Sequence, residues 1–329
     1  SSPEDFRDLE TGVWQPFIKV FGKEESNFEK FFFPYGLIQD SNLKKAQVYP
    51  SLQKEWGRKH SKPEEIISEL KKYQVDYMEI CDGAEDLCGH PKDIRQLFKN
   101  LRDVKQPTST YPFLMQLSSS LRKKRTTPEE TLEVLEVIES FLVRRAICKY
   151  EPTGLHAVFK RLWADLDGAT EGLPSLVVES IRKHKTVSWP EDKQVKEFLL
   201  NNPLYGAVIT PYFLMQYDLS LSLETPSDTP SIEHVLPQTM GKQKCWTEKW
   251  SAQEHREQKD LVGNLTLLTP RGNSVNTNAC YGKKRSFFQE EAMYRITTKL
   301  AEENEDWTPE AIVVRGKEIA KWALKRWAY

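Results

Sequence analysis

The sequence predicts an α+β protein that is mostly α, with a helical N-terminal domain and a small C-terminal domain of two strands and a helix, extended by further helices. Apolar residues recur at helical spacing before residue 222. A stretch rich in Pro, Ser and Thr covers 224–230, as is typical of linkers. Two short β-prone runs, 232–235 and 265–268, follow it. We therefore predict a scaffold domain at 1–222, a linker at 223–230 and a second domain at 231–329.

The composition describes an ordinary globular chain that is long enough for two separate cores. Its 329 residues are 39% hydrophobic and 29% charged, with a net charge of −1. This balance excludes a generic nucleic-acid binder, although residues 231–329 carry 16 Lys and Arg against 13 Asp and Glu. No apolar run approaches membrane-spanning length. Five scattered cysteines, an odd number, fit a reducing cytosol, so we expect a cytoplasmic protein.

Helical signals are strongest from residue 63 onward. Apolar positions in 66–73 and 94–101 recur with helical periodicity. Thr127-Pro128-Glu129-Glu130 is a capping box with proline at the first helical position, and it begins a long helix through Ile147. Further helices are expected at 154–166, 174–184, 190–201 and 208–222. One helix is expected to continue over 286–300, and a last helix follows the cap at Thr308.

The segment 232–288 holds polar residues in an order that suggests chemistry. An unperturbed imidazole titrates near neutral pH, so His234 is a candidate general base. The Glu233 carboxylate and the amide oxygens of Asn273 and Asn278 are hard ligands that suit Mg²⁺ or Mn²⁺. A hairpin of the two strands would place Asn264 behind His234, where its amide could hold the imidazole.

The same segment also has a local excess of positive charge. From Leu261 through Gln289 there is no Asp or Glu, and four basic residues make this region a candidate contact for a polyanion: Arg271, Lys283, Lys284 and Arg285. Taken singly, each element has an ordinary structural interpretation: a hydrogen-bonded acid–histidine pair, a turn at Asn273, and a solvated basic face. Together, and in this order along the chain, these elements favour metal-assisted cleavage of a phosphodiester. Cys81, Cys88 and His90 lack a fourth ligand at finger-like spacing, so we favour a structural role over zinc binding.

Three motifs in this segment resemble the ββα-metal domain of HNH nucleases. They are Glu233-His234-Val235-Leu236-Pro237-Gln238, then Gly263-Asn264-Leu265-Thr266-Leu267-Leu268, then Asn273-Ser274 followed by Thr277-Asn278, Tyr281 and Lys284. The match is closest to the C-terminal HNH domain of GmrSD-type, modification-dependent restriction enzymes and of SspE-type phage-defence nucleases. The resemblance implies His234 as general base, Asn264 as the residue that orients it, and Glu233 with Asn273 as metal ligands. The commoner opening is Asp-His, so the ligand role of Glu233 departs from the usual pattern.

These observations and the resemblance predict an enzyme: a DNA endonuclease or nickase, dependent on Mg²⁺, Mn²⁺ or Ni²⁺, in restriction or anti-phage defence. The expected partner is DNA, in the first instance phage duplex DNA, and no membrane. The family also carries an upstream nucleotide-hydrolysing sensor domain, and no glycine-rich phosphate loop occurs here, so we expect that domain to lie outside this sequence. Two alternatives remain, a catalytically silent DNA-binding module and an RNA-cleaving nuclease.

Overall fold

The computed structural model describes residues 9–22, 25–59, 62–82, 87–222, 229–241 and 243–328. Within these residues helices dominate and two strands form one sheet, which confirms the mostly α, α+β class. The chain divides into two compact units, described separately below. Unit 1 comprises Ser1–Glu139 and Pro152–Ser188, and unit 2 comprises Ser140–Glu151 and Trp189–Tyr329.

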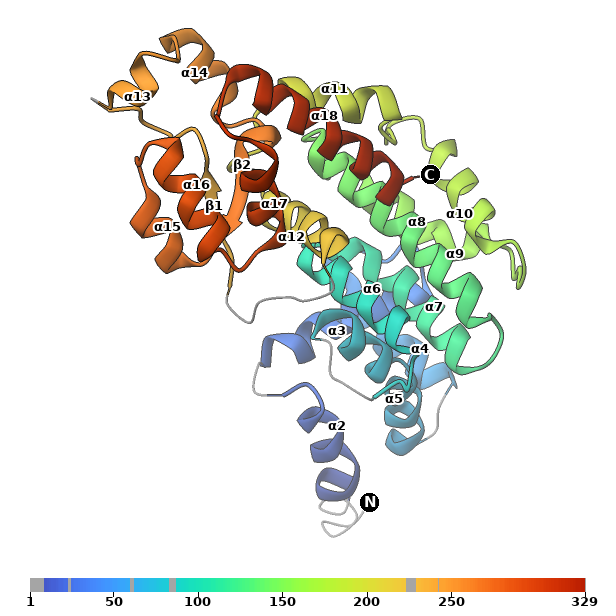
Figure 1. Cartoon of the computed structure of the whole chain (residues 1–329). Coiled ribbons are helices and arrows are strands. Elements are labelled where there is room, and N and C mark those ends of the chain that lie inside the picture. The colour runs from blue at the N-terminus through green and yellow to red at the C-terminus, as the bar shows by residue number, and fades with distance from the viewer. Residues whose placement is uncertain are drawn as a thin grey trace. The chain divides into compact units, whose positions relative to one another are not determined.

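Unit 1 is built from helices (Figure 1). Its elements are the π-helix η1 (Glu10–Trp14), α2 (Gln15–Lys19), α3 (Glu25–Gln39), η2 (Lys45–Gln47), α4 (Val48–Lys59), α5 (Pro63–Cys81), α6 (Lys92–Asp103), η3 (Thr108–Thr110), α7 (Tyr111–Arg122), most of α8 (Pro128–Ile147), α9 (Leu155–Asp165) and α10 (Leu173–Lys183). The aromatic residues near the N-terminus pack in edge-on and tilted arrangements around Phe17, Phe21 and Phe31, all buried. These rings give unit 1 its core, together with the apolar face of α5.

Helix α8 begins where the capping box predicts, with Glu130 N–H donating to the Thr127 hydroxyl. Its C-terminal part from Ser140 to Ile147 belongs to unit 2, and there Arg144 is almost completely buried. The Arg144 guanidinium donates to the carbonyls of Trp327 and Pro190 and to the Asp192 carboxylate. This cation thus fastens the C-terminus of the chain to the start of α11, a structural role.

Unit 2 contains the two-stranded sheet and the helices that follow it (Figure 1). Its elements are α11 (Asp192–Asn201), α12 (Thr210–Leu221), β1 (Ser231–His234), α13 (Lys244–Thr247), α14 (Ala252–Gln258), η4 (Val262–Asn264), β2 (Leu265–Leu268), α15 (Pro270–Asn276), α16 (Tyr281–Glu290), α17 (Arg295–Glu303) and α18 (Pro309–Arg326). The strands pair antiparallel, with Glu233 opposite Thr266 and His234 opposite Leu265. Helices α15 and α17 pack against this sheet.

Most element boundaries agree with the sequence prediction to within two residues. The second strand is as predicted, and the first begins and ends one residue earlier, at Ser231 and His234. The stretch 286–300, predicted as one helix, is instead divided into α16 and α17. The predicted linker 223–230 lies largely outside the described residues, which omit 223–228. The compact units divide at Trp189 rather than at that linker, and the domain boundary at 231 stays a prediction.

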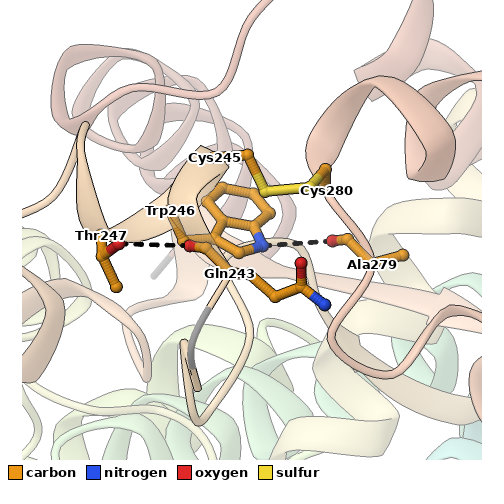
Figure 2. Close-up of a disulfide and its surroundings, with 6 residues drawn as sticks. All are labelled: Gln243, Cys245, Trp246, Thr247, Ala279 and Cys280. Atoms are coloured by element: carbon orange, nitrogen blue, oxygen red, sulfur yellow. Dashed lines mark hydrogen bonds between the residues drawn. A yellow bond between two sulfur atoms is a disulfide. The ribbon is translucent and has the colours of Figure 1, made fainter.

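The core of unit 2 lies around three buried tryptophans, Trp246, Trp250 and Trp307. Trp246 donates its indole N–H to the Ala279 carbonyl at 3.2 Å, beside a disulfide between Cys245 and Cys280 (Figure 2). The sequence interpretation, in which the scattered cysteines fit a reducing cytosol, did not predict this bond and is wrong for these two cysteines. The disulfide joins α13 to the residue that directly precedes α16.

No helix among the described residues has both the length and the apolar composition needed to cross a bilayer.

Candidate functional site

The motif Gly263-Asn264 shapes the entrance to β2 through close packing and hydrogen bonding. A side chain at Gly263 would place its Cβ 2.1 Å from the Ile312 carbonyl oxygen, so only glycine allows α18 to approach this closely. From α18, the buried Arg315 donates to the Gly263 carbonyl at 2.7 Å and to the Leu265 carbonyl at 2.8 Å. Helix α18 therefore holds the start of β2 in place.

The side chain of Asn264 is completely buried, and its hydrogen bonds close the loop after β1. Its Oδ1 accepts from the Leu236 N–H at 2.8 Å and from the Trp307 indole at 3.0 Å. Its Nδ2 donates to the carbonyls of Leu236 and Lys259. None of these bonds goes to the His234 imidazole, so Asn264 acts on the backbone that follows the histidine.

His234 is the last residue of β1 and is largely buried. Its Nε2 lies 3.1 Å from Oδ1 of Asp260, and its ring meets the Tyr205 ring edge-on at 4.3 Å between centroids. Burial lowers the pKa of His234, while the Asp260 carboxylate opposes this shift. The imidazole is therefore kept neutral at moderate pH and has a lone pair to accept a proton.

Glu233 points away from His234, as neighbours on a strand do, and is only 3% exposed. Its Oε1 accepts a hydrogen bond from the Lys284 ammonium at 2.5 Å, and the same ammonium donates to the His234 carbonyl at 2.6 Å. The Lys284 side chain is 0% exposed. Burial raises the pKa of Glu233 and lowers the pKa of Lys284, and each partner opposes the shift of the other.

The structure separates the two asparagines expected as metal ligands. Asn273 lies within α15 and donates to the Ser231 hydroxyl at 2.6 Å and to the Ile232 carbonyl at 3.0 Å, so its amide nitrogen braces β1. Asn278 is exposed in the turn between α15 and α16. Asn276, a residue that we had not singled out, is buried, and its Oδ1 has no hydrogen-bond partner.

The four basic residues expected at DNA differ in exposure. Arg271 and Lys283 are exposed. Arg285 is half-buried and donates to the Ala301 carbonyl at 3.0 Å. Lys284 has no exposed side-chain atom with which to reach a backbone phosphate in this structure. Of the four residues, Arg271 and Lys283 are thus the ones whose side chains are exposed.

The resemblance implies a divalent cation, and the residues present do not form a ready site for it. The carboxylate expected to bind it, Glu233, is taken by Lys284. Among the described residues, no group of three His, Cys, Asp or Glu ligands surrounds His234. These residues therefore do not define a role for a cation in the reaction.

The described residues do contain one compact group of possible ligands, which lies in unit 1. The ligand atoms of Asp76, Cys88 and His90 lie within 4.8 Å of one another. Between them, the Ser118 hydroxyl is 2.6 Å from Asp76 Oδ1 and 2.7 Å from His90 Nε2. Arg122 binds both carboxylate oxygens of Asp76. These polar groups already satisfy one another, so the cluster has the features of a structural network.

A comparison with known families finds one similarity, in the second part of the chain. Residues 189–322 match the family model of GmrSD restriction endonucleases, C-terminal domain. The match begins at Trp189, the residue at which the main segment of unit 2 begins, and it includes α11 and α12. No curated protein matches the chain. The matched segment contains His234, Asn264, Asn273 and Lys284, so the candidate site lies inside the part of the chain that is similar to this restriction endonuclease domain.

Sequence reasoning missed the residue nearest to the imidazole. Asp260 directly precedes the stretch without acidic residues that begins at Leu261. The sequence did offer one signal: Asp260 lies four residues before Asn264. Because β1 and β2 pair antiparallel, the residues just before β2 lie close to the end of β1. Tyr205 gave no signal, because it reaches His234 from a loop before α12.

Proposed function

We propose that unit 2 is a DNA endonuclease or nickase that hydrolyses phosphodiester bonds with the help of Mg²⁺, Mn²⁺ or Ni²⁺, in restriction or defence against phage. One observation carries the proposal: a neutral, buried histidine in contact with a carboxylate lies inside a segment that matches a restriction endonuclease domain. An imidazole of this kind suits a general base for water. The cation dependence rests on the resemblance to HNH nucleases, and phage duplex DNA is the proposed source of substrate.

The remaining residues receive supporting roles in this proposal. Asn264 holds the loop after β1 and so keeps the His234 backbone in place. Asn273 fixes the opposite end of β1. Arg271 and Lys283 offer exposed charge for the DNA backbone. In this proposal the two asparagines hold the backbone around His234 in place, and the two exposed cations bind the phosphates of the DNA.

The test uses the whole chain with supercoiled plasmid and with structured RNA, each in Mg²⁺, Mn²⁺, Ni²⁺ or EDTA. Nicked or linear plasmid that appears with a cation and not with EDTA is the expected result. Cleavage of RNA alone would favour the RNA-cleaving alternative. Retained DNA binding without cleavage in every cation would favour the silent binding module.

A further inference from the structure

The surroundings of His234 determine which of its ring nitrogens carries the proton. Nε2 faces Asp260 Oδ1 at 3.1 Å, and an ionised carboxylate only accepts hydrogen bonds. A neutral imidazole has one N–H, so the hydrogen must lie on Nε2 and the lone pair on Nδ1. No hydrogen bond from the described residues reaches Nδ1. The basic nitrogen is thus left available.

Asp260 is itself held from several directions. Its backbone carbonyl accepts from the N–H groups of Leu204 and Tyr205, at 2.9 and 3.2 Å. Its second carboxylate oxygen pairs with Lys259 at 3.0 Å. The loop that carries Tyr205 is thereby fixed to the residue that holds the histidine. Both contacts of the His234 ring, the carboxylate and the tyrosine, therefore belong to one rigid assembly.

Glu233 is placed quite differently, although it neighbours His234 in sequence. Its charge is balanced by the buried Lys284, which also binds the His234 carbonyl. A buried carboxylate bound to an ammonium is a poor ligand for a cation, because binding would leave Lys284 unpaired in the interior. The pair fixes the backbone at the end of β1.

We propose that Asp260 is the positioning residue for His234, and that Glu233 with Lys284 is a structural pair instead of part of a metal site. This inference deepens the proposed function and rests on it. In the step, water loses a proton to Nδ1 as its oxygen attacks phosphorus, and the bond from phosphorus to the leaving oxygen breaks. The leaving oxygen takes a proton from solvent, and Asp260 stabilises the imidazolium that forms.

The first experiment compares Asp260→Asn and Asp260→Glu with the parent protein in plasmid cleavage. An asparagine amide at 260 can donate to Nε2 and so favours the wrong tautomer. We expect kcat to fall about 10²–10⁴-fold with little change in KM. Asp260→Glu should recover part of the loss, because it restores a carboxylate acceptor. Asp306→Asn is the matched control, since Asp306 pairs with Lys249 elsewhere in unit 2. Cleavage by Asp260→Asn at the parent rate overturns the proposal.

The second experiment tests the Glu233 half of the inference. Glu233→Gln/Lys284→Gln removes both charges and leaves two amides that can hydrogen-bond, and Glu233→Lys/Lys284→Glu exchanges the partners. Thermal melting identifies which variant folds. In a folded variant we expect kcat within about tenfold of the parent, because neither side chain contacts the His234 imidazole, and an unchanged cation concentration for half-maximal rate. A marked rise in that concentration would make Glu233 a ligand and overturn this half.

A third measurement separates this inference from the proposed function. Protein with ¹⁵N-labelled histidine reports which nitrogen of His234 is protonated, with His234→Ala used to assign its signal among the six histidines. We expect the Nε2–H form in the parent and its loss in Asp260→Asn. If the parent cleaves nothing, the proposed function fails, but this measurement still shows whether Asp260 sets the tautomer of His234. An Nδ1–H form in the parent would contradict the positioning role of Asp260 even if cleavage is observed.

Discussion

Each unit buries a histidine beside an aspartate, and the two pairs are bonded in different ways. In unit 1 the Ser118 hydroxyl lies between His90 and Asp76, and Arg122 neutralises that aspartate. In unit 2 the His234 ring meets Asp260 directly. The Ser118 hydroxyl donates its single hydrogen to Asp76, so it accepts from His90 Nε2, and a hydroxyl therefore stands between His90 and its carboxylate. The direct bond between ring and carboxylate is what distinguishes His234 in unit 2 from His90 in unit 1.

The strongest way to test this difference is to remove each histidine in turn. His234→Ala should lower plasmid cleavage by about 10²–10⁴-fold, because it removes the proposed base. His90→Ala should leave the rate unchanged, since His90 is bonded within a closed network of unit 1. Initial rates at a temperature where both variants are folded by circular dichroism give the comparison. Equal losses in the two variants would contradict it.

The aspartates should also differ in how much stability depends on their cationic partners. Arg122→Gln leaves Asp76, which is 0% exposed, without its countercharge and should cost about 3–5 kcal/mol of unfolding free energy. Lys259→Gln removes a partly exposed partner of Asp260 and should cost only about 0–1 kcal/mol. Urea unfolding of both variants measures the two losses. Similar small losses would show that the Asp76 network is more hydrated than its burial implies.

His90 should make the protein less stable in mild acid. Burial lowers the pKa of His90 from 6.5 to about 4, so the folded protein resists its protonation while the unfolded chain does not. Stability from this residue is fully present above pH 6.5 and is lost as the pH falls from 6.5 to 4, by at most about 3 kcal/mol. Unfolding at pH 7 and pH 4.5 should show a smaller loss in His90→Gln than in the parent. Equal losses would remove His90 as the cause.

The smallest expected effect concerns which unit supplies charge to the DNA backbone. Lys283→Ala, in unit 2, should weaken DNA binding modestly and reduce the slope of log K against log salt by about 1. Lys124→Ala changes a lysine of unit 1 that is also exposed and serves as the matched control. DNA binding across a salt series in EDTA measures both slopes. A larger change for Lys124 would assign the phosphate contact to unit 1.

Local sequence patterns predicted the fold well because they depend on short-range physics. The capping box at Thr127, the cap at Thr308 and the strand 265–268 all act within a few residues of their own position. The break between α16 and α17 was missed, since no proline marks it and the two helices pack against each other.

The partners within the site were harder to predict, because they come from distant parts of the chain. Glu233 and Lys284 are 51 positions apart, and His234 and Asp260 are 26 apart. A carboxylate next to a histidine in sequence suggested a functional pair, but strand alternation sends the two side chains in opposite directions. The residue types indicated which side chains were candidates, whereas only the three-dimensional structure showed which of them contact one another.

The disulfide between Cys245 and Cys280 changes what a single backbone cleavage does to the protein. It closes a loop of 35 positions that contains β2, Asp260, Asn264 and Asn273. One backbone cut anywhere inside this loop would leave both fragments linked through sulfur, so the nicked protein would migrate as one species until a reductant released them. Reduction of the disulfide would then separate the two fragments. Of the residues around His234, Asp260 and Asn264 lie within the closed loop, whereas Tyr205 and Lys284 lie outside it.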